Sequence, residues 1–126
     1  MRETKFTSIC LLAAFWALPA VADDCSDLEA QEAKVAAAKN CGEAHKLYEA
    51  CLWGSTADLQ RGSVVTETCE KAFLSTLSAA QQKSYSRKKD ACAKKYRNES
   101  GTMYRSMEAV CIADAAYDYW KKYGTK

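Results

Sequence analysis

The chain has 126 residues, of which 48% are hydrophobic and 27% are charged, and its formal net charge is only +2. The only proline is at position 19, so no proline interrupts a helix after it, and stretches that alternate between polar and apolar residues are absent. Together these features predict an all-α protein. After residue 22 no segment is apolar enough to cross a bilayer, which excludes a membrane-spanning domain there. A chain of this length has a limited core and fits one domain.

The first 22 residues predict a cleavable export signal. Arg2 and Lys5 give it a positive start, residues 6–18 form an apolar run, and Ala20 and Ala22 are the small residues that signal peptidase requires. The run is too short for a transmembrane anchor. We expect cleavage after Ala22, so that residues 23–126 form a single domain in the periplasm or outside the cell.

Cysteine usage supports an oxidising compartment. Removal of the signal takes Cys10 away and leaves six cysteines, an even number that predicts a disulfide framework in a small exported chain. Their spacing contains no Cys-x-x-Cys pair, which disfavours a metal site and excludes covalent haem attachment. We therefore expect disulfides, no metal and no cofactor. The six are Cys25, Cys41, Cys51, Cys69, Cys92 and Cys111.

Helix signals recur along the whole exported chain and predict a bundle of four to five helices. A capping box at Ser26 and Glu29 starts a first helix over residues 26–40, and Gly42 gives it a stop. The second covers residues 43–53, where apolar side chains recur at helical spacing. The first helix has a weak apolar face, so we expect it at the periphery of the domain.

Three further helices are expected in the second half. The third covers residues 63–77, after a loop over residues 55–62. A capping box at Ser78 and Gln81 starts the fourth, which continues to Arg97. The fifth covers residues 102–123 and is apolar on more than one face, so we expect it at the centre of the domain.

Helix geometry constrains the disulfides. Cys92 and Cys111 lie at similar distances from the turn at residues 98–101, so an antiparallel hairpin places them level and pairs them.

The other four cysteines leave two alternatives. One is Cys25 with Cys51 and Cys41 with Cys69. Symmetry about the loop at residues 55–62 instead pairs Cys51 with Cys69 and leaves Cys25 with Cys41. A continuous helix between Cys25 and Cys41 holds them about 20 Å apart, beyond disulfide reach, which favours the first alternative.

Catalytic signals are weak. His45 is the only histidine, and we interpret it as an exposed helical residue among charged neighbours. The motifs of hydrolases, metalloproteases and phosphate-binding loops are missing, so we do not expect an enzyme. Asp114 and Asp118 form an i, i+4 pair on the last helix. They mark its solvent strip, or one of them is partly buried with a raised pKa.

Charge is unevenly distributed along the chain. Residues 23–70 contain ten acidic and four basic residues, whereas residues 79–98 contain seven basic and one acidic residue. The basic helix is a candidate surface for anionic envelope components, and the exported location argues against nucleic acid. The candidate binding residues are Lys88, Lys89, Lys94, Lys95, Tyr119 and Trp120.

The second half resembles the LprI-type family of exported bacterial proteins, which is named for lysozyme inhibition. The resemblance rests on Leu77, Gln81, Cys92, Gly101 and Cys111. It implies an all-helical disulfide domain and a role as a lysozyme inhibitor. The family's usual residues are replaced at Ser84, Lys88, Ala116 and Tyr119. A non-catalytic binding protein is therefore the leading expectation, and the alternative is an envelope- or polyanion-binding module that uses residues 79–98.

Overall fold

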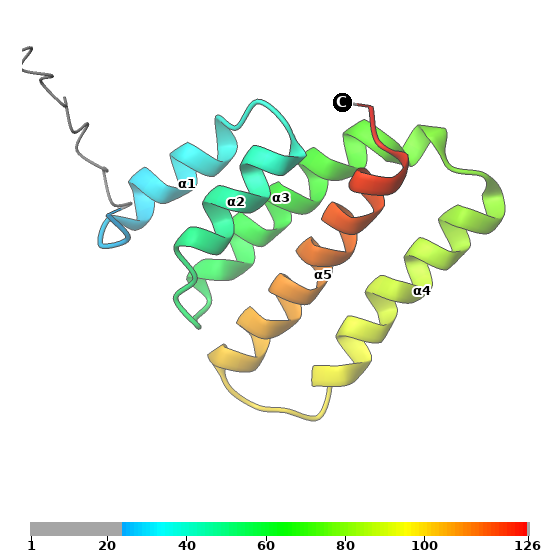
Figure 1. Ribbon diagram of the computed structural model, residues 1–126. Helices are drawn as coiled ribbons and strands as arrows, with labels where there is room; N and C mark the ends of the chain where they lie inside the picture. Colours follow the sequence, from blue (N-terminus) through cyan, green and yellow to red (C-terminus); the bar gives the residue numbers. More distant parts are fainter. Residues whose placement is uncertain (1–23, 126) are drawn as a thin grey trace, which may run out of the picture.

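The computed structural model describes residues 24–125 and confirms the all-α fold class (Figure 1). The expected signal, its cleavage site and Cys10 lie outside the described residues. None of the helices described there has the length and hydropathy that a bilayer crossing requires. The elements are α1 (Leu28–Ala36), α2 (Cys41–Ala50), α3 (Ala57–Phe73), the 3-10 turn η1 (Leu74–Thr76), α4 (Ala79–Tyr96) and α5 (Thr102–Tyr123).

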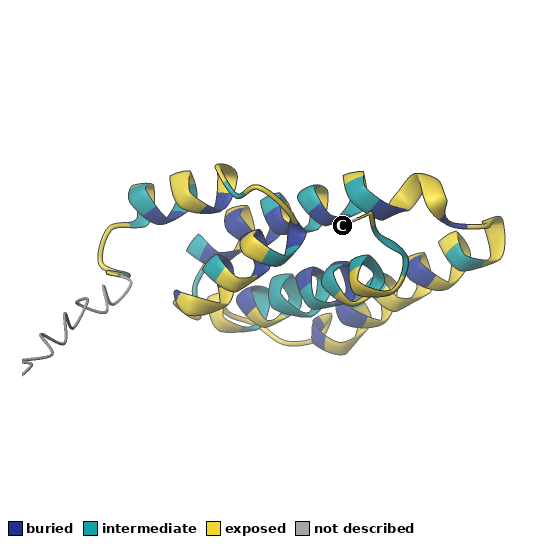
Figure 2. Ribbon diagram, turned by 45° about the horizontal axis from the view of Figure 1, so that its top comes forward, coloured by how far each residue is buried: buried dark blue, intermediate teal, exposed yellow. Residues whose placement is uncertain are grey.

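Helix α5 lies at the centre of the bundle, as its apolar faces predict. It packs between α3 and α4 and also touches α2, while α1 lies at the edge against α2 and α3 (Figure 1). Its alanines at 113, 115 and 116 are buried and let the neighbouring helices approach closely. Figure 2 shows the buried positions along the facing sides of the helices and exposed positions on the outer sides.

The start of α1 corrects one sequence prediction. Asp27, not Ser26, is the N-cap, and its carboxylate accepts a hydrogen bond from the backbone N–H of Ala30 at 3.0 Å. The helix ends at Ala36, earlier than expected, because Asn40 caps the next helix by accepting from the Glu43 N–H. The chain must therefore leave the helical conformation before residue 40.

Helix α2 begins at Cys41 and ends at Ala50, so Gly42 lies in its first turn and does not stop a helix. A Cβ on Gly42 would lie 3.1 Å from the Trp120 ring, which indicates that this glycine gives α5 room to pack. Trp53 lies beyond the helix, in a turn where Gly54 adopts a φ of +67°.

Helix α3 starts at Ala57, within the stretch that the sequence predicts as a loop. The carboxylate of Asp58 accepts hydrogen bonds from the backbone N–H groups of Trp53, Gly54 and Ser55, which fixes the turn before the helix. Helix α3 ends at Phe73 and not at Leu77.

The last two helices agree with the sequence. Both halves of the capping box at Ser78 and Gln81 are formed at the start of α4, which ends at Tyr96, and α5 covers the predicted residues.

Three disulfides are present: Cys25–Cys51, Cys41–Cys69 and Cys92–Cys111. They match the pairing that helix geometry favours. The first two join α2 to the segments on either side of it, and the third joins α4 to α5. Among residues 24–125 no disulfide links the α1–α3 half to the α4–α5 half, so these halves are held together by packing between α3 and α5.

Gly62 is required for close packing and not for a turn. A Cβ there would lie 2.9 Å from Tyr48 Oη, and that hydroxyl is fixed by donating to the Asp58 carbonyl at 3.0 Å. We expect Gly62→Ala to lower the free energy of unfolding by about 1–3 kcal/mol, although this change usually stabilises a helix. Urea unfolding measures it, with exposed Ser63→Ala as the control. A stabilised Gly62→Ala variant would contradict this account.

Candidate functional site

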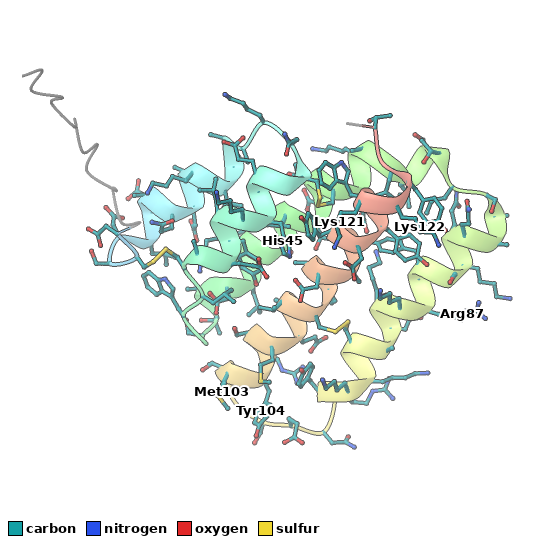
Figure 3. The ribbon with its side chains drawn as sticks, in the orientation of Figure 1. His45, Arg87, Met103, Tyr104, Lys121 and Lys122 are labelled. Carbon is teal, nitrogen blue, oxygen red and sulfur yellow. A yellow bond between two sulfur atoms is a disulfide. The ribbon has the colours of Figure 1, made fainter. Side chains whose placement is uncertain are left out.

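His45 is buried, which corrects the prediction that it is exposed. Its residue exposure is 5%, because α5 packs across the side of α2 that carries it. The imidazole stacks on the Tyr117 ring of α5, with 4.1 Å between ring centroids and 10° between planes. Figure 3 shows His45 between the two helices. The stacking fixes the plane of the imidazole.

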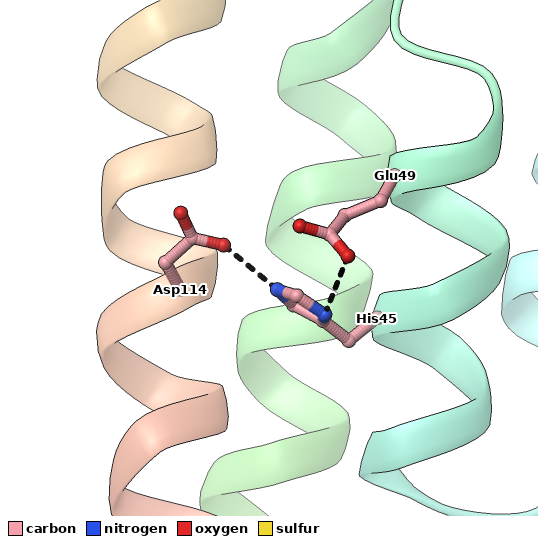
Figure 4. A group of neighbouring side chains, drawn as sticks. All are labelled: His45, Glu49 and Asp114. Carbon is pink, nitrogen blue, oxygen red and sulfur yellow. Dashed lines mark hydrogen bonds and ion pairs between the residues drawn. The ribbon is translucent and has the colours of Figure 1, made fainter.

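Both nitrogens of the His45 ring face a carboxylate (Figure 4). Nε2 lies 2.7 Å from Asp114 Oδ1 on α5, and Nδ1 lies 3.4 Å from Glu49 Oε2, one turn further along α2. The Asp114 and Glu49 side chains are about half exposed, at 49% and 54%. The cluster therefore consists of a buried imidazole and two carboxylates that are about half exposed to solvent.

This arrangement has a chemical consequence. A general base needs a free nitrogen in reach of its substrate, and here each nitrogen is already directed at a carboxylate. One nitrogen of His45 and one oxygen from each of Glu49 and Asp114 lie within 4.8 Å of one another, which is a donor set that can hold a cation. The sequence pattern does not reveal this cluster, because Asp114 lies 69 residues from His45.

The two aspartates of the predicted i, i+4 pair have separate partners. Asp114 contacts His45, whereas Asp118 pairs with Lys121 at 2.9 Å and with Lys88 at 3.5 Å. The hydrogen bond from Lys121, aided by both positive charges, holds the pKa of Asp118 below its ordinary value despite partial burial. A raised pKa, the alternative that the sequence left open, is therefore wrong for Asp118.

The four candidate lysines of α4 divide into two groups. Lys88 pairs with Asp118, and Lys89 pairs with Glu70 of α3 at 2.7 Å, so these two stabilise the domain itself. Lys94 and Lys95 form no ion pair with any residue in 24–125. Arg87 also extends away from the bundle (Figure 3). Part of the basic helix is thus available to a partner.

The two candidate aromatic residues close the core. Tyr119 packs near the rings of Phe73, Tyr85 and Tyr123, with centroid distances from 4.8 to 5.9 Å. Trp120 is packed against the core, and its buried Nε1 has no hydrogen-bond partner within the described part of the chain. Both have roles within the domain.

Three hollows border α3, and two of them also touch α1 or α5. The first has a volume of about 440 Å³ and is bordered by α3, α5 and Lys89, and the second, about 330 Å³, lies between α1 and α3. Five glutamates line these two hollows, together with the cations Arg61, Lys89 and Arg105. We call this surface the acidic α3 face and define it by Glu29, Glu32, Glu67, Glu70 and Glu108.

The carboxylates of the acidic α3 face differ in their partners. Glu70 pairs with Lys89, and Glu108 pairs with Arg105 at 2.7 Å. The other three, at positions 29, 32 and 67, form no ion pair with residues 24–125. The acidic excess of residues 23–70 was the sequence signal for this face, but only the fold places α1 beside α3.

Comparison with known proteins gives no further identification. No family model matches the chain, and neither the curated proteins nor the solved structures include a match.

Proposed function

We propose that this chain is a non-catalytic binding protein of the periplasm or extracellular space, released by cleavage after Ala22, and that its acidic α3 face binds a basic protein. Lysozyme is the first partner to test. The observation that carries the proposal is a set of unpaired carboxylates beside two hollows on a disulfide-linked scaffold. Electrostatic complementarity of this kind speeds and orients association with a basic partner.

Two further observations support a lysozyme inhibitor. Lysozymes are generally basic, and the resemblance of residues 77–111 to the LprI-type family points to the same partner. The basic helix α4 lies at the opposite edge of the bundle from α1 (Figure 1), so a cationic protein that approaches the α1 side meets acids first.

A non-catalytic role also agrees with the chemistry of the chain. All six cysteines of residues 24–125 are in disulfides and cannot act as nucleophiles. Both nitrogens of His45 are engaged by carboxylates.

The test is binding and inhibition of several lysozyme types by the purified, oxidised protein, at concentrations well above that of the enzyme. We expect the double substitution Glu29→Gln and Glu67→Gln to weaken binding about tenfold at low salt, since two attractive charges are lost. Asp90→Asn with Glu99→Gln is the matched control, because it removes two exposed acids elsewhere, and should change binding less than about twofold. Equal losses in both variants, or no inhibition of any lysozyme, would refute the proposal.

A second candidate function is binding of anionic lipid or polysaccharide by α4. Lys94 and Lys95, which lack ion pairs within residues 24–125, favour it. It predicts association with vesicles of anionic lipid, but not of neutral lipid, that weakens as salt rises. Lys94→Gln with Lys95→Gln should reduce that association, whereas Lys39→Gln with Lys46→Gln on the opposite side should not. Equal binding by the first variant would exclude α4 as the surface.

A further inference from the structure

The cluster of His45, Glu49 and Asp114 brings two carboxylates to one buried imidazole. Oxygens of the two carboxylates lie 2.7 and 3.4 Å from the two ring nitrogens. A neutral imidazole offers a nitrogen lone pair, which is the ligand that first-row transition metals accept from histidine. The two carboxylates can supply oxygen ligands to the same ion.

We propose that this cluster binds a divalent transition-metal ion, for which Zn²⁺ is the probe. The donor set is one imidazole nitrogen and one oxygen from each carboxylate. Zn²⁺ and its neighbours in the first transition row accept such mixed nitrogen and oxygen ligands, whereas Ca²⁺ and Mg²⁺ prefer oxygen alone. This site is separate from the acidic α3 face and does not depend on the proposed function.

The ligands come from two adjacent helices. His45 and Glu49 are i and i+4 on α2 and share one side of that helix, and Asp114 reaches them from α5. The ligand atoms lie within 4.8 Å of one another, whereas bonds of about 2.0–2.2 Å in tetrahedral geometry place ligand atoms about 3.4 Å apart. Because Asp114 faces Nε2 and Glu49 faces Nδ1, one carboxylate must turn toward the nitrogen that holds the ion. The exposed carboxylates can make that movement by rotation, while burial and Tyr117 stacking keep the imidazole in place.

The surroundings leave the cluster free for a metal. Lys121, the neighbouring cation, lies 4.5 Å over the Tyr117 ring and pairs with Asp118, one turn beyond Asp114. The six cysteines of residues 24–125 are oxidised and offer no thiolate. Within residues 24–125 no second group of three His, Cys, Asp or Glu side chains converges in this way. Water can complete the coordination from the solvent side, where the two carboxylates are exposed.

The experiment is calorimetric titration of Zn²⁺ into the purified protein, oxidised and without a histidine tag, at pH 7.5. We expect one Zn²⁺ per chain, and Ca²⁺ or Mg²⁺ in its place should bind much more weakly. Because His45 is the only histidine, its imidazole signal in ¹H–¹⁵N NMR needs no assignment. That signal should shift on addition of one equivalent of Zn²⁺ and not on addition of Mg²⁺.

Variants identify the ligands. Glu49→Gln and Asp114→Asn change exposed side chains, so they keep the fold, and each should weaken Zn²⁺ binding at least about tenfold. Asp118→Asn is the control: it removes an acid one turn from Asp114 and should leave the affinity within about twofold. Unchanged affinity in both ligand variants, or an unmoved imidazole signal at saturating Zn²⁺, would overturn the proposal.

Discussion

Replacement of Asp58 by alanine is expected to lower the free energy of unfolding by about 3–5 kcal/mol, because it leaves the buried guanidinium of Arg61 without its counter-charge. Asp58 and Arg61 are 0% and 1% exposed, and Arg61 Nη2 lies 2.6 Å from Asp58 Oδ1. The guanidinium also lies near the rings of Tyr48 and Trp53. Its Nε and Nη1 have no hydrogen-bond partner among the described residues, so it depends strongly on Asp58.

The same carboxylate organises three segments of the chain. It accepts from the backbone of the turn before α3, and Ser106 of α5 donates to it at 2.6 Å. Asp58→Ala therefore removes the acceptor that orders the turn before α3 as well as a link from α3 to α5. Ser106→Ala removes only one of these hydrogen bonds, and we expect it to cost about 1–2 kcal/mol. Equal effects of Asp58→Ala and Ser106→Ala in chemical denaturation would contradict this ranking.

Stability should also depend on the ionisation of Asp58. Burial alone would raise its pKa, but the hydrogen bonds from Ser106 and from the backbone of Trp53, Gly54 and Ser55 outweigh burial and lower it. A lowered folded-state pKa contributes stability that is present above the unfolded value of about 3.9 and is lost as the pH falls further. The stability difference between wild type and Asp58→Asn should therefore shrink below about pH 4. A difference that stays constant down to pH 2.5 would exclude this contribution.

Loss of the Cys41–Cys69 disulfide is the second large effect. Substitution of both cysteines by alanine should lower the free energy of unfolding by about 2–5 kcal/mol, since the bridge closes a loop of 28 residues and both cysteines are buried. The substitution also removes two sulfur atoms from the core between α2 and α3. Thermal and urea unfolding measure the change.

The control is removal of Cys92–Cys111 by the same substitutions. That bridge closes a shorter loop, with a separation of 19 residues, and Cys111 is only partly buried, so its loss should cost less. A larger cost for loss of Cys92–Cys111 would contradict this ranking of the two disulfides.

Much of the fold could be predicted because its signals are local. The capping box at Ser78 and Gln81 marks the start of α4, and the turn at residues 98–101 separates α4 from α5. The pairing of Cys92 with Cys111 followed from an antiparallel hairpin about that turn, and the choice between the other two alternatives followed from the rise of a helix. Three residues that the sequence singles out in this half have structural roles: Leu77 is buried, Gln81 caps α4, and Gly101 precedes α5 with a φ of +112°.

Two of the helix boundaries that were wrong share one physical cause. Gly42 was interpreted as a helix stop and Gly62 was placed in the loop at residues 55–62, but both lie inside helices and make room for large side chains, Trp120 and Tyr48 respectively. A glycine needed for space and a glycine needed for positive φ cannot be distinguished in one sequence. The distinction depends on which distant ring packs against the helix.

The candidate site was hidden for a similar reason. Periodicity along α2 places Ala44 and Tyr48 on the apolar side and His45 at its edge, so exposure of His45 depends entirely on where α5 lies. The fold then brings Asp114 to the imidazole. The acidic α3 face likewise needs α1 beside α3. Local patterns identify the charged residues, but only tertiary contacts decide which of them meet.

The distribution of the disulfides makes the connection after α3 a point of weakness. Exposed residues 74–76 of η1 lead into α4, and no covalent bond other than the backbone joins the two halves across it in residues 24–125. A protease that cuts there would produce two internally cross-linked fragments, held to each other by noncovalent packing. After such a cut the two fragments could separate at the α3–α5 contact without reduction of any disulfide in residues 24–125.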